Sequence, residues 1–274
     1  MYLGYNTNGL AHHDPFQAIE IVAETGYRAI AITLDHQWLN PYSSEIRKQL
    51  PRFREHLERN GLKVIIETGA RFLLEPRKKH WPPLTDSPEI ANLRVDFIAR
   101  ACMIAEELGA PVVSIWSGSA DENQSQQSAL DNLATNLTEA LKAAEQHNVT
   151  LGFEPEPGMM IDTLAAFFRL KQWIEHPRLK LTVDIGHLFC QGELPIVDKL
   201  NEWQEEIVNV HIEDMRSHVH EHLMFGDGEI YFPPIFDALK QMQYAGPVCV
   251  ELSRHSHDAV NAVRKSFSFL NQLV

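Results

Sequence analysis

Short runs of apolar, mostly β-branched residues alternate along the chain with longer segments in which apolar residues recur every three or four positions. The first pattern predicts buried strands, and the second predicts amphipathic helices. Strands are expected at 2–7, 27–34, 62–68, 111–118, 149–154, 179–184, 207–212 and 247–252. Helices are expected at 14–26, 43–61, 89–109, 128–148, 162–176, 187–206, 232–243 and 256–273.

This order gives eight strand-then-helix units with no evident linker between them. Strands that alternate with helices predict a parallel sheet. Eight such units predict a closed (β/α)8 barrel, the α/β fold called a TIM barrel, as a single domain over residues 1–274. A doubly wound open sheet is the alternative, but "NTNGLAHHD" after the first strand lacks the glycine spacing of a dinucleotide-binding loop. The long polar segment 69–89 is expected to be a functional loop or a lid.

Composition narrows the classes of function. The chain has 274 residues, 44% of them hydrophobic, and a net charge of -13. A protein with this much negative charge repels phosphate backbones. We therefore expect no nucleic-acid partner. Cys102, Cys190 and Cys249 lie far apart among apolar neighbours, which predicts buried thiols rather than disulfides or zinc ligands. No stretch has the pattern of a signal peptide or the ~20 apolar residues of a membrane span, so a cytoplasmic protein without membrane contact is expected.

Acidic and imidazole side chains gather at the C-terminal ends of the last four predicted strands. In a (β/α)8 barrel these ends carry the reactive groups. The strands end with "FEPEP", "VDIGH", "VHIEDMR" and "VELSRHSH". Several carboxylates in one buried mouth would repel one another, and a divalent cation would relieve that repulsion. We therefore expect four metal ligands, which are Glu154, Asp184, His211 and Glu251.

Three carboxylates and one imidazole make a mostly oxygen donor set. Such a set suits Mn²⁺, Mg²⁺ or Co²⁺ and also admits Zn²⁺. Glu156 faces the same side of the strand as Glu154 but lies beyond Pro155. We therefore expect Glu154 to bind the ion and Glu156 to contact the substrate. Trp116 is interpreted either as an apolar wall for a sugar or as a core residue, and any one of the polar residues alone could simply cap a helix.

Strand ends that carry Glu, Asp-x-x-His, His and Glu in this order resemble the xylose-isomerase-like barrel superfamily. That superfamily includes sugar and sugar-phosphate isomerases and epimerases, inosose dehydratases and endonuclease-IV-type repair enzymes. The resemblance covers essentially the whole chain and is strongest at "GFEPEP", "VDIGH", "VNVHIED" and "VCVELSRHSHD". It implies the same four ligands, with Glu154 and Glu251 also serving as acid and base. It further implies that His187 and Arg216 contact substrate oxygens, although the spacing of Arg216 from His211 departs from that of the epimerases.

The chemistry that suits such a site is proton transfer next to a carbonyl. An ion chelated by two oxygens of a ketose would polarise the carbonyl and make the neighbouring C–H acidic. One glutamate would remove the proton, the cation would hold the enediolate, and the other glutamate would return a proton. We expect a metal-dependent sugar, sugar-phosphate or cyclitol isomerase or epimerase with a small carbohydrate substrate. A homodimer is a candidate assembly.

Three alternatives stay open. An inosose-type dehydratase would need the same metal and a base. An endonuclease-IV-like nuclease would need histidines after the third and fourth strands, where the sequence has "IETGARF" and "SIWSGS". A barrel that only binds a small molecule is the non-enzymatic alternative. The segment "RSHVHEHLMFGDGE" adds His218, His220 and His222, which are interpreted as solvated loop residues, as substrate contacts (His220 and His222), or as ligands of a second metal.

Overall fold

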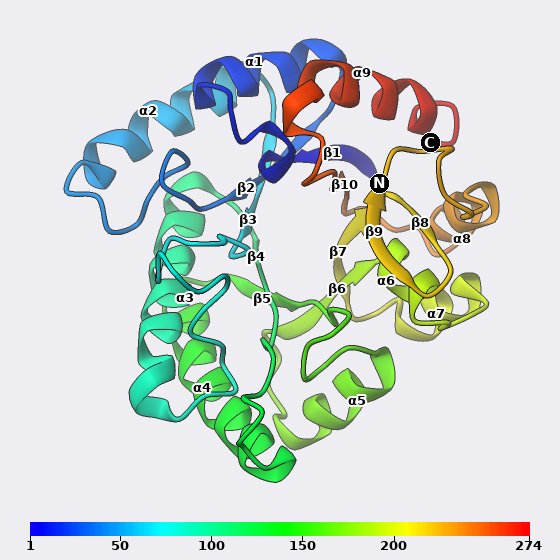
Figure 1. The fold of residues 1–274 in the computed structure, drawn as a ribbon. Coiled ribbons are helices and arrows are strands. Elements are labelled where there is room, and N and C mark those ends of the chain that lie inside the picture. Colours follow the sequence, from blue (N-terminus) through cyan, green and yellow to red (C-terminus); the bar gives the residue numbers. More distant parts are fainter. The chain divides into compact units, whose positions relative to one another are not determined.

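The structure of the protein is a computed structural model that describes all residues from Met1 to Val274. Eight parallel strands close into a barrel in the order β1-β10-β7-β6-β5-β4-β3-β2 (Figure 1), which confirms the predicted (β/α)8 class over the doubly wound sheet. The barrel strands are β1 (Tyr2–Asn6), β2 (Ala29–Thr33), β3 (Lys63–Glu67), β4 (Val112–Ile115), β5 (Thr150–Phe153), β6 (Leu179–Asp184), β7 (Ile207–Ile212) and β10 (Pro247–Val250).

Helices follow the strands along the chain, as the sequence pattern predicts. They are α1 (Pro15–Thr25), α2 (Ile46–Arg59), α3 (Pro88–Leu108), α4 (Gln126–Gln146), α5 (Leu164–Trp173), α6 (Ile185–Cys190), α7 (Ile196–Trp203), α8 (Pro233–Gln241) and α9 (Ala259–Leu270). Two short 3-10 helices, η1 (Thr7–Leu10) and η2 (Ser256–Asp258), complete the set. None of the helices is both long enough and apolar enough to cross a lipid bilayer.

The predictions from the sequence differ from the structure at two places. The helix expected at 187–206 is two helices, α6 and α7, because Gly192 takes a φ of +73° and Pro195 precedes α7. The segment after β7, which was interpreted as a loop, is an antiparallel hairpin of β8 (Asp214–Arg216) and β9 (Val219–Leu223). The three cysteines are buried free thiols, as predicted.

The chain divides into two compact units by its internal contacts. Unit 1 comprises Met1–Ile32, Arg52–Val64 and Leu181–Val274, and unit 2 comprises Thr33–Pro51 and Ile65–Lys180. Unit 1 therefore carries the first strands and the last ones, and unit 2 carries the middle of the chain. The single domain over residues 1–274 stays a prediction.

In unit 1, strand pairing places the chain's first strand beside its last, because β1 pairs with β10 on one side and with β2 on the other. The packing outside these strands depends on Tyr27, whose ring meets Tyr5 and Phe267 edge-on at centroid distances of 5.6 and 5.0 Å. Its hydroxyl donates to Val263 O at 3.1 Å, which ties the start of β2 to α9. Helices α1 and α9 lie side by side (Figure 1).

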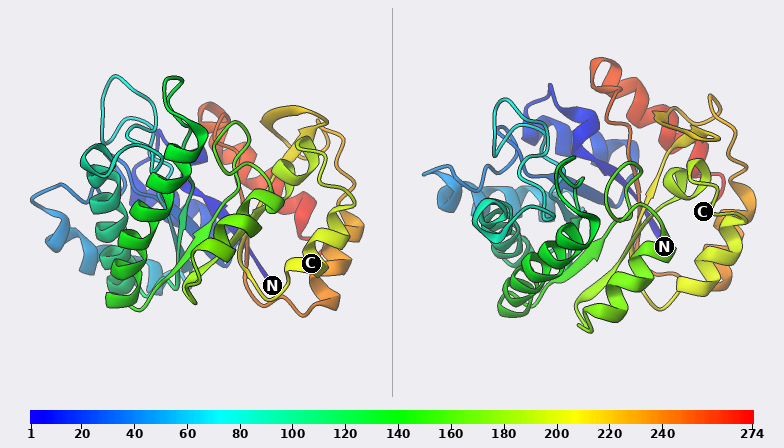
Figure 2. Two further views of the ribbon diagram at one scale, coloured as in Figure 1. Left: turned by 90° about the horizontal axis from the view of Figure 1, so that it is seen from below. Right: turned by 60° about the horizontal axis from the view of Figure 1, so that its bottom comes forward.

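In unit 2, strands β3, β4 and β5 pair in parallel, and the long helices α3 and α4 lie side by side (Figure 2). The segment between β3 and α3 contains no helix or strand, but side chains of both helices hold it. Asn136 on α4 donates from Nδ2 to Leu84 O at 2.8 Å and to Asp86 O at 2.9 Å. The C-terminal half of this predicted loop is therefore fixed to the helices.

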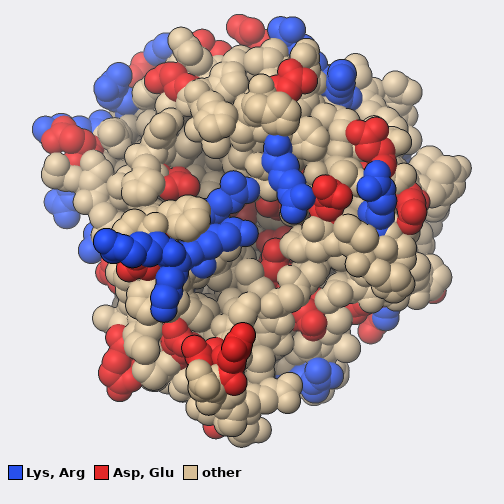
Figure 3. Space-filling view, in the orientation of Figure 1, with Lys and Arg blue, Asp and Glu red and all other residues tan.

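Arg94 on α3 also holds the segment between β3 and α3 in place. Its side chain is buried, with Nε donating to Pro82 O and Nη2 to His80 O, both at 3.0 Å. The guanidinium carbon also lies 4.8 Å from the ring centre of Trp116. Basic side chains gather on the outer surface of the segment (Figure 3), where the exposed cations are Arg71, Arg77, Lys78 and Lys79.

The buried guanidinium yields a stability prediction. An Arg94→Met variant keeps much of the volume but leaves the carbonyls of Pro82 and His80 without donors. We expect its free energy of unfolding in urea to fall by about 2–3 kcal/mol. Arg100→Met on the same helix is the matched control, because Arg100 is exposed and pairs with half-exposed Asp96, and it should cost under about 1 kcal/mol. Equal effects of the two substitutions would contradict the role given to Arg94.

His80 makes a pH-dependent contribution to stability. Burial, reinforced by Lys79, lowers the pKa of this imidazole to about 4. In the unfolded chain His80 takes up a proton near pH 6.5, whereas in the folded chain it does so only near pH 4. The free energy of unfolding therefore decreases as the pH falls from 6.5 to about 4. From pH 7 to pH 5 the wild type should lose about 1–2 kcal/mol more than His80→Asn, since Asn tolerates the φ of +59° at this position. Parallel pH profiles in urea titrations would disprove this.

Candidate active site

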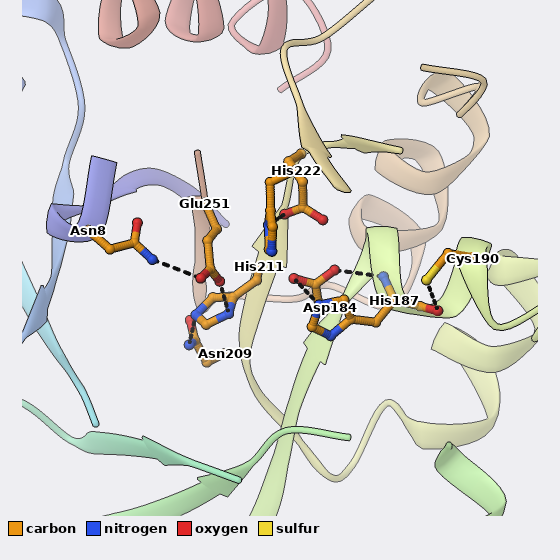
Figure 4. Close-up of polar contacts among 9 residues, drawn as sticks. Asn8, Asp184, His187, Cys190, Asn209, His211, His222 and Glu251 are labelled. Atoms are coloured by element: carbon orange, nitrogen blue, oxygen red, sulfur yellow. Dashed lines mark hydrogen bonds and ion pairs between the residues drawn. The ribbon is translucent and has the colours of Figure 1, made fainter. Parts of the chain in front are cut away.

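Asp184, His211 and Glu251 come from the C-terminal ends of three strands of unit 1, β6, β7 and β10. Parallel pairing sets Asp184 beside His211 and His211 beside Cys249. The candidate ligand atoms of the three side chains lie within 4.8 Å of one another. Figure 4 shows their side chains pointing toward one another. Three of the four ligands predicted from the sequence are thus brought together within this unit.

Two asparagines, Asn209 and Asn8, hold His211 and Glu251 in place. His211 Nδ1 lies 3.0 Å from Glu251 Oε2, and its Nε2 lies 3.1 Å from Asn209 Nδ2. Asn8 in η1 donates from Nδ2 to Glu251 Oε1 at 2.8 Å. The sequence reasoning missed Asn209, although it precedes His211 by two positions and so faces the same side of β7.

Asp184 has two roles, which explains the spacing Asp-Ile-Gly-His. Its Oδ1 accepts a hydrogen bond from His187 N at 2.8 Å and so caps the N-terminus of α6. Its other oxygen, Oδ2, lies 3.8 Å from His187 Nε2. The residue that ends β6 therefore also sets the position of the buried imidazole one helical turn later.

The electrostatics of unit 1 show an excess of negative charge at this place. Glu213 is fully buried, and burial together with the charges of Asp184 and Glu251 raises the pKa of its carboxyl well above the ordinary value. Burial alone would also raise the pKa of Glu251, but His211 outweighs it and holds that pKa low. The site thus has anionic oxygens, one imidazole and too little positive charge, and a divalent cation fits that donor set.

The remaining predicted residues of the middle strands lie in unit 2. Glu154 follows β5, is buried, and donates from its backbone N to Ile115 O at 2.8 Å. Glu156 begins a turn in which its carbonyl accepts from Met159 N at 3.0 Å. Trp116 is buried and meets the ring of His80 edge-on at 5.1 Å. The roles of Glu154 as ligand and base and of Glu156 and Trp116 as substrate contacts stay predictions.

The hairpin β8–β9 separates the histidines that the sequence had grouped. His218 is exposed at the turn, whereas His220 and His222 lie on β9 with ring centres 5.2 Å apart. Both face His187, at 4.8 and 6.0 Å. Burial, then the neighbouring imidazoles, lowers the pKa of His220 to about 4, so its ring is neutral at pH 7.

Arg216 lies on the exposed side of the same hairpin. Its Nη2 donates to Asp227 O at 3.3 Å. Sequence reasoning expected this arginine to contact substrate oxygens, and that role stays a prediction. The neighbouring Asp214 is buried and accepts from the backbone of Met215, Gly226 and Ile230 at 2.8–3.1 Å, so it shapes the hairpin.

A family model described as xylose isomerase-like TIM barrel matches residues 19–273. The chain belongs to this family. L-ribulose-5-phosphate 3-epimerase UlaE of Escherichia coli is 23% identical over 206 residues, which are 74% of this chain and 72% of that protein.

Solved structures share the fold. A D-tagatose 3-epimerase-like protein aligns with a TM-score of 0.79 and 23% identity over 99% of both chains. The IolI protein with a bound zinc atom aligns with a TM-score of 0.78 and 17% identity over 100% of this chain and 99% of its own. Sequence relatives and structural neighbours of the chain thus include sugar epimerases, which are isomerases.

Gly186 in the first turn of α6 provides a test of how tightly the site is packed. A Cβ at this position would overlap Glu213 Oε1 and approach Met215 Cε to 2.7 Å. We expect Gly186→Ala to lower the free energy of unfolding in urea by about 1–3 kcal/mol, because the buried side chains of Glu213 and Met215 would both have to shift. Gly69→Ala is the control, since its Cβ would meet nothing within 4 Å. Wild-type stability of Gly186→Ala would show that the site is looser than described.

Proposed function

We propose that this protein is a divalent-metal-dependent isomerase of the sugar epimerase type, acting on a small sugar, sugar phosphate or cyclitol. The observation that carries the proposal is the convergence of Asp184, His211 and Glu251, whose ligand atoms lie within 4.8 Å of one another at the ends of three strands. The similarity to L-ribulose-5-phosphate 3-epimerase supports the substrate class.

Four side chains would hold the ion in this proposal. Three are Asp184, His211 and Glu251, and we add Glu154, the carboxylate that directly follows β5, as the proposed fourth ligand. When bound, the ion supplies positive charge that makes a C–H beside a sugar carbonyl more acidic. The oxygen-rich set favours Mn²⁺, Mg²⁺ or Co²⁺, and the zinc bound by the structurally similar IolI protein keeps Zn²⁺ as an alternative.

Glu251 and Glu154 are the proposed acid and base. Asn8 and His211 hold both oxygens of Glu251 in fixed directions, as a proton-transfer group requires. The low pKa of Glu251 keeps it ionised at neutral pH, so it can accept a proton from carbon. The other glutamate would deliver a proton to the opposite face, which inverts the carbon centre.

Substrate oxygens would be bound around these two glutamates. We assign this role to His187, His220, His222, Arg216 and Glu156, and we propose Trp116 as an apolar wall for the sugar. The exposed cations Arg71, Arg77, Lys78 and Lys79 on the segment between β3 and α3 would favour an anionic substrate such as a sugar phosphate. A cytoplasmic location and a homodimer belong to the same proposal.

The test is hydrogen exchange from a panel of ketoses, inososes and their phosphates in D₂O. We expect the wild type to exchange deuterium into one substrate, and Glu251→Gln to slow that exchange by at least about 10²-fold. Glu122→Gln, an exposed glutamate in unit 2, is the control and should exchange like the wild type.

Circular dichroism would verify that Glu251→Gln is folded. Undiminished exchange in the folded variant would refute the assignment of Glu251. Loss of water from an inosose instead of exchange would identify the dehydratase alternative. A wild type that exchanges nothing across the panel would favour the binding barrel.

A further inference from the structure

A second group of candidate metal ligands lies beside the first and consists only of imidazoles. The ring nitrogens of His187, His220 and His222 come within 4.8 Å of one another. His187 stands in α6, which contacts β9, and the other two stand on β9. Because residues two apart on a strand face the same side, the pair on β9 presents two rings to the one on α6.

Burial distinguishes these three histidines from His218, the remaining histidine of the hairpin. The side chain of His187 is 3% exposed and that of His222 is 12% exposed, whereas His218 is exposed at the turn. Solvated loop residues, the simplest interpretation of "SHVHEH", would not be drawn into one partly buried cluster. Three imidazole rings that share so little space have a common reason to converge if they bind one cation.

The buried carboxyl group of Glu213 lies next to the ring of His222. Glu213 Oε2 lies 3.7 Å from His222 Nδ1, and Glu213 is fully buried. Imidazoles that bind a metal through one nitrogen commonly direct the other to a carboxylate, which fixes the tautomer and the ring. This arrangement would leave Nε2 of His222 for the ion. Figure 4 shows His222 extending from β9 toward the side of Asp184 and His187.

We propose that His187, His220 and His222 bind a second divalent cation, and that Zn²⁺ is the ion they match best. Three nitrogen donors with an open fourth position are a zinc donor set, in contrast to the oxygen-rich set of Asp184, His211 and Glu251. An anionic oxygen of a substrate could occupy the open position, so that these histidines would meet the substrate through the ion. Binding of the ion does not depend on the proposed isomerase activity.

The experiment is a metal count that needs no substrate. Purified full-length protein is freed of metal with a chelator and titrated with Zn²⁺, with calorimetry and elemental analysis giving the number of ions per chain. We expect two ions in the wild type and one in His220→Ala and in His222→Ala. Glu251→Gln, which damages the other site, should retain the imidazole ion and also bind one. The double variant His220→Ala/Glu251→Gln should bind none tightly.

The matched control is His218→Asn, because His218 lies outside the cluster and Asn tolerates its φ of +59°. It should bind two ions like the wild type. Titration with Co²⁺ adds a spectroscopic readout, since a four-coordinate imidazole site absorbs visible light more strongly than a six-coordinate oxygen site. We expect that strong absorption in the wild type and Glu251→Gln but not in His220→Ala.

One ion in the wild type, or two in folded His220→Ala and His222→Ala, would overturn the second site. Either result would leave the proposed isomerase untouched, because that proposal depends on exchange in the wild type and its loss in Glu251→Gln. Conversely, two ions in a protein that exchanges nothing would retain the imidazole site and remove the proposed activity. The two proposals can therefore fail separately.

Discussion

Concentrated negative charge at the ends of β6, β7 and β10 is the constraint on which the rest of the site depends. Asp184 ends β6 beside His211, and burial together with the charges of Asp184 and Glu251 raises the pKa of Glu213. His211 offsets the charge of Glu251 and holds the pKa of that carboxyl low. A divalent cation would relieve this repulsion, so the proposed chemistry of the site depends on where the strands place these carboxylates.

Much of the fold could be predicted because strands and helices have different patterns of apolar residues along the chain. Apolar runs fixed the eight strands, and helices with Gly26 and Gly109 just after their ends were placed to within a few residues. Asp184, His211 and Glu251 were found by one rule, that reactive groups follow strands of a parallel barrel. The rule depends only on topology, and closure of the sheet supplies that topology. It accounts for the convergence of the three side chains, and their role as ligands stays a prediction.

The sequence did not reveal the β8–β9 hairpin or the role of Asn209, because both depend on contacts with residues that no local sequence pattern specifies. The strands β8 and β9 pair mainly with each other and stay partly exposed, so "VHEHL" lacks the apolar face by which a strand is recognised. Asn209 was overlooked because an amide that only holds a ring has no motif. The separation of His218 from His220 and His222 required the hairpin register, in which Arg216 pairs with Val219.

Asp184 connects the two donor sets. One of its oxygens caps α6 at His187 N, and its side chain also belongs to the group with His211 and Glu251. The helix that presents His187 to the hairpin is therefore fixed by a residue of the oxygen-rich site. Hard oxygen donors and imidazole nitrogens prefer different ions, so two ions bound side by side would sort between these sets rather than compete for one. The spacing Asp-x-x-His places one member of each set, Asp184 and His187, one helical turn apart at the start of α6.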